Sequence, residues 1–190
     1  MKYEAIAIGA SAGGLNAFKS ILPLLKEAFP LPILIVQHIS PQSDNYMTVH
    51  LDKLCKIQVK EAEEKEKIKP GHAYFSPPNF HMLIEEDRSI SFSVENKVNY
   101  ARPSIDVLFE TAAFAFTNRL IGIILTGANN DGASGLKKIQ ELGGLTIVQD
   151  PEDAEVNTMP ASALKIMKPD KILKLNEIAG FLNNLTKKHH

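Results

Sequence analysis

Three residues of this sequence carry the side chains that a serine hydrolase needs, and each of them follows an apolar run. Ser11 follows the run that ends at Gly9, His38 follows the run 33–37, and Asp131 follows the run 120–125. If the three converge, a hydroxyl can act as nucleophile, an imidazole as general base and a carboxylate as the group that orients the imidazole. The sequence therefore predicts acyl transfer through a Ser-His-Asp triad.

Each of these residues also has a structural interpretation. Ser11 and Asp131 can cap the helices that follow them, and His38 can be a hydrogen-bonded histidine at the end of a strand. The pattern Gly9-x-Ser11-x-Gly13 matches the nucleophile elbow of α/β-hydrolases, but the chain order Ser, His, Asp differs from the order of that family. Gly9, Ser11 and Gly14 resemble a dinucleotide fingerprint in which the second glycine is replaced, so a nucleotide-binding protein is an alternative, although no acid follows the second strand.

The elements that must position these residues alternate between strand and helix. Apolar runs predict strands at 4–9, 33–37, 57–59, 120–125 and 145–148, and helical spacing predicts helices at 17–29, 44–54, 104–117, 131–142 and from Pro160 onward. Such alternation predicts an α/β fold, with a single doubly wound, mostly parallel sheet and helices on both faces. Ligands bind beyond the carboxyl ends of the strands of such a sheet, where all three candidates are expected.

The middle of the chain breaks this alternation. Eight of the ten residues 60–69 are charged, which is typical of a solvated segment. Three short β-like runs follow at 72–76, 81–85 and 89–94, the last two separated by Glu86-Asp87-Arg88. These runs predict an antiparallel β excursion near residues 72–95.

Composition limits the function classes. The 190 residues carry 21 Lys+Arg and 22 Asp+Glu, and this balance argues against a nucleic-acid partner. No apolar stretch approaches the ~20 residues of a membrane span, so no membrane insertion is expected. The single cysteine, Cys55, excludes an internal disulfide, fits a reducing, cytoplasmic location and is expected to be a small buried hydrophobic residue. The histidines and Cys55 lack metal-ligand spacing, so neither a metal nor a cofactor is expected.

Short motifs in a fixed order extend over nearly the whole chain. They are AIGASAGG at 7–14, VQH at 36–38, VKEA at 59–62, PGHAY at 70–74, RPSIDVLF at 102–109, ILTG at 124–127, DGA at 131–133 and MP at 159–160. With these motifs the sequence resembles the catalytic domain of CheB-type chemotaxis receptor methylesterases, the protein-glutamate methylesterases.

The resemblance implies a function and a partner. The family's catalytic triad falls on Ser11, His38 and Asp131, and the implied reaction is hydrolysis of glutamate γ-methyl esters on chemoreceptors with release of methanol. Deamidation of receptor glutamines is implied as a side activity. The implied partners are methylated cytoplasmic receptor helices or another methylated protein.

The sequence departs from the family pattern where an oxyanion would be bound. Ala12 replaces the usual Thr, and Ala128-Asn129-Asn130 replaces the usual Met-Gly-x. A backbone N–H at Ala128 survives this change, and Asn129 tolerates a positive φ. These departures leave a catalytically impaired binding module of the same fold as an alternative.

The resemblance also draws attention to residues around the predicted triad. Arg102 can face an acidic substrate helix, or can serve an ion pair or a helix start. Met159, at the end of the loop 150–159, is expected near the substrate. His72 and His81 are expected to be structural.

Residues 1–186 are expected to form the catalytic domain, and 187–190 are expected to be a tag remnant. The family's receiver domain usually precedes the catalytic domain, whereas here the catalytic motif begins almost at Met1. No receiver domain is therefore expected in this chain, and a separate receiver or other regulator becomes a candidate partner.

Overall fold

A seven-stranded sheet forms the centre of the protein in a computed structural model that describes residues 2–39 and 46–186. The strand order is β3-β4-β2-β1-β7-β8-β9, and every neighbouring pair is parallel. The strands are β1 (Ala5–Ala10), β2 (Ile33–Gln37), β3 (Gln58–Glu61), β4 (His72–Phe75), β7 (Leu120–Ile124), β8 (Leu145–Gln149) and β9 (Lys171–Leu173). This confirms the predicted doubly wound α/β fold.

The direction in which successive strands are added to the sheet reverses at β1. This strand pairs with β2 on one side and with β7 on the other, so that Ile6 lies between Ile33 and Ile121. Ligands of open α/β sheets bind at such a switch point, beyond the carboxyl ends of the strands. The segments after β1, β2 and β7 are the ones that carry Ser11, His38 and Asp131.

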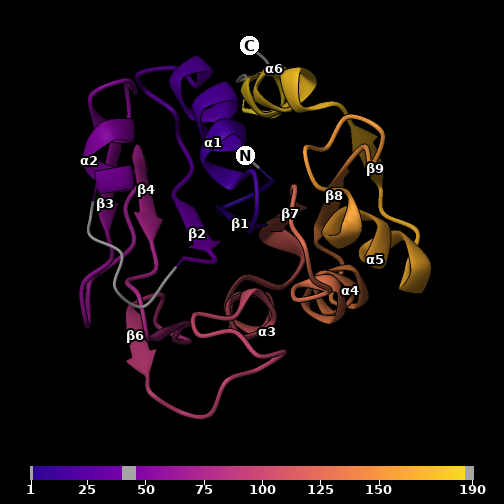
Figure 1. The fold of residues 1–190 in the computed structure, drawn as a ribbon. Helices are drawn as coiled ribbons and strands as arrows, with labels where there is room; N and C mark the ends of the chain where they lie inside the picture. The colour runs from indigo at the N-terminus through magenta and orange to yellow at the C-terminus, as the bar shows by residue number, and fades with distance from the viewer. Residues whose placement is uncertain (1, 40–45, 187–190) are drawn as a thin grey trace.

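Helices cover both faces of the sheet (Figure 1). One face packs against α1 (Gly14–Ile21), α2 (Tyr46–Asp52) and α6 (Leu175–Leu185), and the other against α3 (Ile105–Phe116), α4 (Ala133–Glu141) and α5 (Thr158–Ile166). Alternate residues of β1 supply the two cores, with Ile6 and Ile8 on the α1 side and Ala5 and Ala7 on the α3 side.

A small residue at the end of β1 allows α3 to approach the site. A Cβ atom added at Gly9 would lie 2.3 Å from the Ile105 side chain, at the first turn of α3. Glycine is therefore required at this position, because any side chain would push the start of α3 away from the sheet.

The antiparallel excursion is confirmed in part. Strands β5 (His81–Ile84) and β6 (Ile90–Ser93) form an antiparallel hairpin. The first of the three predicted runs does not belong to it, because β4 pairs in parallel with both β2 and β3. Three of its four residues are buried, as in a strand covered on both faces.

Several predicted boundaries shift. The helix predicted at 17–29 ends as an α-helix at Ile21 and continues as a 3-10 turn over Leu22–Leu24, because Pro23 has no N–H to donate. Helix α5 begins at Thr158, so Pro160 lies within its first turn instead of opening it. The first two residues of the helix predicted at 44–54 and the predicted tag remnant 187–190 lie outside the described residues.

No helix among the described residues is long and apolar enough to cross a membrane. Cys55 is only half-buried and packs against the core on the α1 side, and burial raises the pKa of its thiol to about 11.

Candidate active site

Asp131 is fully buried, and five hydrogen bonds reach its carboxylate. Oδ1 accepts from the Ser104 hydroxyl at 2.8 Å, from Asn99 Nδ2 at 3.2 Å and from the Asp106 N–H at 3.2 Å. Oδ2 accepts from the Ile105 N–H at 2.6 Å and pairs with His38 Nε2 at 2.8 Å. The carboxylate thus lies at the N-terminus of α3, where the backbone N–H groups and the helix dipole favour a negative charge.

His38 lies between Asp131 and Asn129. Because Nε2 faces the Asp131 carboxylate, that nitrogen carries the proton and Nδ1 keeps its lone pair. Asn129 Nδ2 is 3.2 Å from Nδ1, and its Oδ1 accepts from the Asp131 N–H at 3.1 Å. The second contact fixes the amide orientation, so the NH₂ group of Asn129 is the one that faces the imidazole.

Ser11 lies in the turn between β1 and α1, where Gly13 has φ +81°. Gln37 Nε2 donates to the carbonyl oxygens of both Ser11 and His38, at 2.8 and 2.9 Å. This amide joins the turn to the end of β2. A Cβ atom at Gly14 would lie 1.8 Å from the Gln37 side chain, so glycine is required there.

The Ser11 hydroxyl makes no hydrogen bond to another described residue. The backbone N–H groups of Ala12 and Ala128 also have no hydrogen-bond acceptor among the described residues. Both of these alanines are exposed. Ser11, His38 and Asn129 line one pocket of about 290 Å³.

Thr126 joins the loops around this pocket. Its carbonyl oxygen accepts from the Ser11 N–H at 2.9 Å, and its hydroxyl donates to the Ala12 carbonyl oxygen at 2.8 Å. The same hydroxyl accepts from the Val156 N–H at 2.8 Å. The loop 150–157 is therefore joined through Thr126 to the turn that carries Ser11.

The two carboxyl groups at the start of α3 differ in their pKa values. Burial acts to raise the pKa of Asp131, but hydrogen bonds, first that from His38, hold this pKa below its ordinary value. Burial raises the pKa of Asp106 to about 6, and the Asp131 charge adds to this rise. Asp106 accepts from Asn99 Nδ2 at 2.7 Å, so one amide joins both carboxyl groups.

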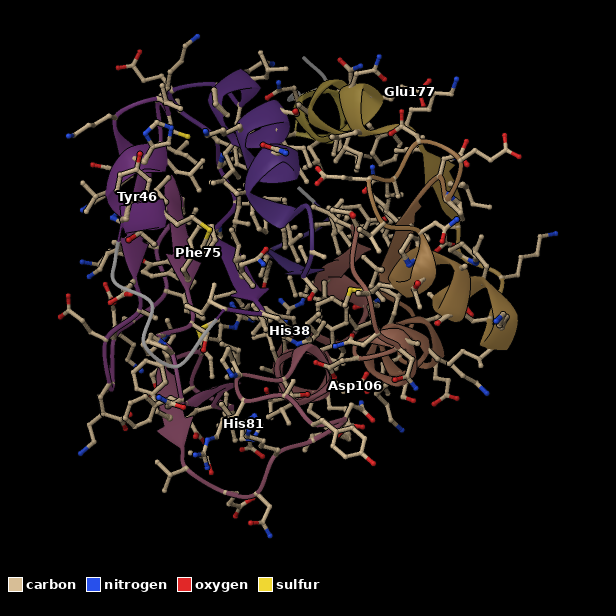
Figure 2. The ribbon with its side chains drawn as sticks, in the orientation of Figure 1. His38, Tyr46, Phe75, His81, Asp106 and Glu177 are labelled. Carbon is tan, nitrogen blue, oxygen red and sulfur yellow. The ribbon has the colours of Figure 1, made fainter. Side chains whose placement is uncertain are left out.

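Figure 2 shows His38 and Asp106 near the start of α3, with Tyr46 and Glu177 far from them.

The rim of the pocket includes Arg102, Lys97 and Tyr100. Arg102 Nη1 donates to the carbonyl oxygens of Val94 and Glu95 at 2.6 and 3.0 Å, and Arg102 forms no ion pair with another described residue. Its guanidinium therefore holds the segment after β6 and still borders the pocket.

Met159 lies behind the pocket. Its side chain is fully buried against Gly127, where an added Cβ would lie 2.6 Å from it. In this structure Met159 therefore supports the turn after β7 and does not line the pocket.

His81 and His72 have structural contacts. His81 Nδ1 accepts from the Ser104 N–H at 3.2 Å, and its Nε2 donates to the Asn96 carbonyl oxygen at 3.1 Å. His72 bonds the Pro70 carbonyl oxygen at 2.9 Å and stacks on Tyr74. The described residues contain no group of three or more His, Cys, Asp or Glu that could hold a metal ion.

A second hollow, of about 340 Å³, lies at the amino edge of the sheet. Its lining includes Glu4, Arg88 and Phe116. Glu4 forms ion pairs with Arg88 at 2.6 Å and with Arg119 at 2.5 Å. These charges are paired with one another, and the described residues that line this hollow include no serine, cysteine or histidine.

Sequence reasoning did not find the roles of Gln37, Asn99 and Ser104 in this site. Gln37 lies in a quoted motif at the end of β2, and Ser104 lies in a quoted motif just before α3, and that position was the available signal. Asn99 lies outside the motifs, and no local signal marks it. Asn129 was considered for its backbone only. It is not among the residues with positive φ, and its contribution is made by its side chain.

Comparison with known proteins places the chain. A family model described as CheB methylesterase matches residues 6–182. The chain belongs to the CheB methylesterase family. The crystal structure of the Thermotoga maritima CheB methylesterase catalytic domain is similar to this one with a TM-score of 0.93 at 32% identity, covering 98% of this chain and 100% of that chain.

Relatives of two lengths are similar to the chain. A putative protein-glutamate methylesterase/protein-glutamine glutaminase of Leptospira interrogans is 58% identical over 179 residues, which cover 94% of this chain and 93% of the relative. Protein-glutamate methylesterase/protein-glutamine glutaminase 4 of Geobacter metallireducens is 38% identical over 90% of this chain, but only 52% of that relative is covered. The chain thus spans about half the length of the second relative. These comparisons confirm the resemblance drawn from the motifs.

Proposed function

We propose that this protein is a serine hydrolase that removes γ-methyl esters from glutamate residues of chemoreceptors and releases methanol. The observation that supports this most strongly is the meeting of the Ser11 hydroxyl and the His38–Asp131 pair at one pocket of a CheB-family fold. The homologues named protein-glutamate methylesterase/protein-glutamine glutaminase support the same substrate class.

In the proposed reaction, Ser11 is the nucleophile and His38 is its base. Ser11 Oγ forms a bond to the ester carbonyl carbon while His38 Nδ1 takes the hydroxyl proton. Asp131 keeps the Nε2–H tautomer and stabilises the imidazolium that forms. Nδ1–H then gives its proton to the departing methoxy oxygen, and methanol leaves. A water molecule hydrolyses the acyl-enzyme by the reverse sequence of proton transfers.

The developing oxyanion needs donors that are already in place. The N–H of Ala12 follows Ser11 in the chain, and that of Ala128 lies in the turn after β7. Neither has an acceptor among the described residues, so they are the proposed backbone donors. The Ala12 methyl group removes no backbone donor. This argues for an active enzyme over the alternative of an impaired binding module.

The same acyl-enzyme route accepts an amide in place of an ester. Attack on a receptor glutamine would release ammonia and leave glutamate, which is the glutaminase activity named for the relatives. The proposed partners are the methylated cytoplasmic helices of chemoreceptors, approached by the rim that carries Lys97, Tyr100 and Arg102.

The test is to incubate the protein with a methylated receptor fragment and to measure methanol and intact mass. Loss of about 14 Da per site together with methanol is expected for ester hydrolysis, and a gain of about 1 Da without methanol for deamidation. An unchanged receptor mass with every methylated receptor tried would contradict the proposal.

A further inference from the structure

The Asn129 amide occupies the nitrogen of His38 that must accept the Ser11 proton. Its Nδ2 is 3.2 Å from Nδ1, while Nε2 is engaged with Asp131 at 2.8 Å. An imidazole nitrogen has one in-plane lone pair, so it cannot accept well from the amide and from the serine hydroxyl together. The Ser11 hydroxyl accordingly has no partner among the described residues.

Proton transfer reverses the character of this contact. Once Nδ1 has taken the proton it becomes a donor, and an N–H of Asn129 that points at it no longer has an acceptor. The Oδ1 end stays bonded to the Asp131 N–H at 3.1 Å, so the amide group is held beside the pocket while its NH₂ group loses its partner. The acceptor that forms at the same moment is the carbonyl oxygen of the substrate, which becomes an oxyanion.

We infer that Asn129 is a further catalytic residue, whose side-chain NH₂ holds His38 Nδ1 in the free protein and donates to the oxyanion when Ser11 attacks. This inference rests on the proposed function of the Ser11 site. The step is balanced: the Ser11 Oγ–carbon bond forms, the carbonyl π electrons move to oxygen, and the hydroxyl proton moves to Nδ1. Asn129 supplies a hydrogen bond and neither gains nor loses a proton.

Two features of this chain favour the assignment. Position 12 is alanine, so no side-chain hydroxyl next to the nucleophile can donate to the oxyanion. Asn129 is only partly buried and lines the same pocket as Ser11, so its amide can reach a bound substrate. Side-chain amides serve as oxyanion donors in other serine hydrolases, where removal of one donor costs about 10²–10³-fold in kcat.

The test measures the rate at which a neutral alkyl fluorophosphonate labels Ser11, because the phosphoryl oxygen of this probe develops charge as the ester oxygen does. We expect Asn129→Ala to slow labelling by about 10–100-fold. Asn129→Asp keeps the Oδ1 acceptor for the Asp131 N–H but removes the donor, so it should slow labelling at least as much. Asn130→Ala is the matched control, since that exposed side chain makes no hydrogen bond to another described residue.

The possible outcomes distinguish a failure of the Asn129 inference from a failure of the proposed function. Labelling that is as fast or faster in Asn129→Ala would overturn the inference, because the amide would then only obstruct the base. If Asn129→Asp were labelled at the rate of the unsubstituted protein, the inference would be overturned too. The hydrogen bond from the Asp131 N–H to Oδ1 would then be the contribution of residue 129, and the NH₂ donor would not be needed. Rapid labelling of the unsubstituted protein without methanol release from any methylated receptor would instead contradict the proposed substrate and leave the Asn129 result interpretable.

Discussion

The two sides of the His38 ring have opposite surroundings. On the Nε2 side, Asp131 is fully buried and its carboxylate accepts five hydrogen bonds, three of them from the start of α3. On the Nδ1 side, the Ser11 hydroxyl has no partner among the described residues and the pocket is open. In the proposed reaction, the fixed side holds the Asp131 charge in place, whereas the open side is completed only when a substrate enters.

The difference follows from the elements that build each side. The fixed side combines the turn after β7 with the N-terminus of α3, whose position depends on Ser104 and on the His81 ring beneath it. The open side is formed by the exposed turn that follows β1, whose own backbone is held by Gln37 and Thr126. Rigid support therefore reaches the backbone of Ser11 but leaves its side chain unrestrained.

Asp131→Asn should have the largest effect, because it damages the fixed side in both activity and stability. An amide at this position must direct its NH₂ group at N–H donors, since both carboxylate oxygens now accept hydrogen bonds. We expect turnover to fall by about 10⁴-fold and the free energy of unfolding to fall by about 3–5 kcal/mol. Urea unfolding alongside methanol release measures both. If the free energy of unfolding of this variant were unchanged, the hydrogen bonds of the Asp131 carboxylate would not stabilise the fold as expected.

Ser11→Ala should lose activity without losing stability. The hydroxyl makes no hydrogen bond to another described residue, so its removal costs no hydrogen bond within that part of the fold. We expect methanol release to fall by about 10⁴-fold or more, with the free energy of unfolding unchanged within about 0.5 kcal/mol. Methanol assay and urea unfolding of the same preparation check this. Ser134→Ala, an exposed serine on α4, is the control that should keep both properties. Retained turnover in Ser11→Ala would reject its role as nucleophile.

Asp106→Asn, a substitution next to the fixed side, should change how the free energy of unfolding depends on pH. Its pKa is raised to about 6 from 3.8, so the folded state binds a proton more tightly than the unfolded state does. The free energy of unfolding should therefore decrease as the pH rises from about 4 to about 6, by up to about 3 kcal/mol. Asp131, with a lowered pKa, contributes stability that is lost as the pH falls below about 3.8.

In Asp106→Asn the decrease between pH 4 and 6 should disappear, as measured by unfolding at a series of pH values. The substituted side chain can still accept from the Gly135 N–H, which bonds Asp106 at 2.6 Å. A pH dependence identical to that of the unsubstituted protein would assign the decrease to another group.

Tyr100→Gly should have the smallest effect, and it concerns the rim of the open side. Val98 and Ala101 exchange two backbone hydrogen bonds across a turn in which Asn99 and Tyr100 have φ of +50° and +63°. Tyr100 is 96% exposed, so this strained conformation places a ring at the pocket rim that contributes no burial. We expect the variant to be more stable by about 1 kcal/mol and to have a higher KM for receptor. A loss of stability would mean that the ring supports the fold.

The sequence predicted the sheet, and it predicted that Ser11, His38 and Asp131 follow strands of that sheet, because both depend on local patterns. Short apolar runs predicted the strands, and the residues just after them predicted the site, because parallel strands place their carboxyl ends at one edge. The pairing of β4 with β2 and β3 was missed. The run His72–Phe75 is four residues long, and its partner strands begin at residues 33 and 58. No local sequence pattern therefore indicates whether this strand pairs in parallel or antiparallel.

The supporting side chains were also beyond local patterns. Asn99 reaches a carboxylate 32 positions away, and Asn129 reaches a ring 91 positions away. Amides have no periodic signature, and their partners become visible only when the turns after different strands are placed together. Met159 is a motif residue whose side chain is buried behind the turn after β7 and does not line the pocket, a position that its motif does not indicate.

The proposed reaction requires that His38 is protonated on Nε2 toward Asp131 and receives the Ser11 proton on Nδ1. Nitrogen-15 NMR of histidine-labelled protein at alkaline pH reports which ring nitrogen carries the proton. We expect His38 to have a protonated Nε2 and an unprotonated Nδ1, and Asn129→Ala to alter the Nδ1 resonance more than the Nε2 resonance. A free protein in which Nδ1 carries the proton would contradict the assignment of Nδ1 as the base.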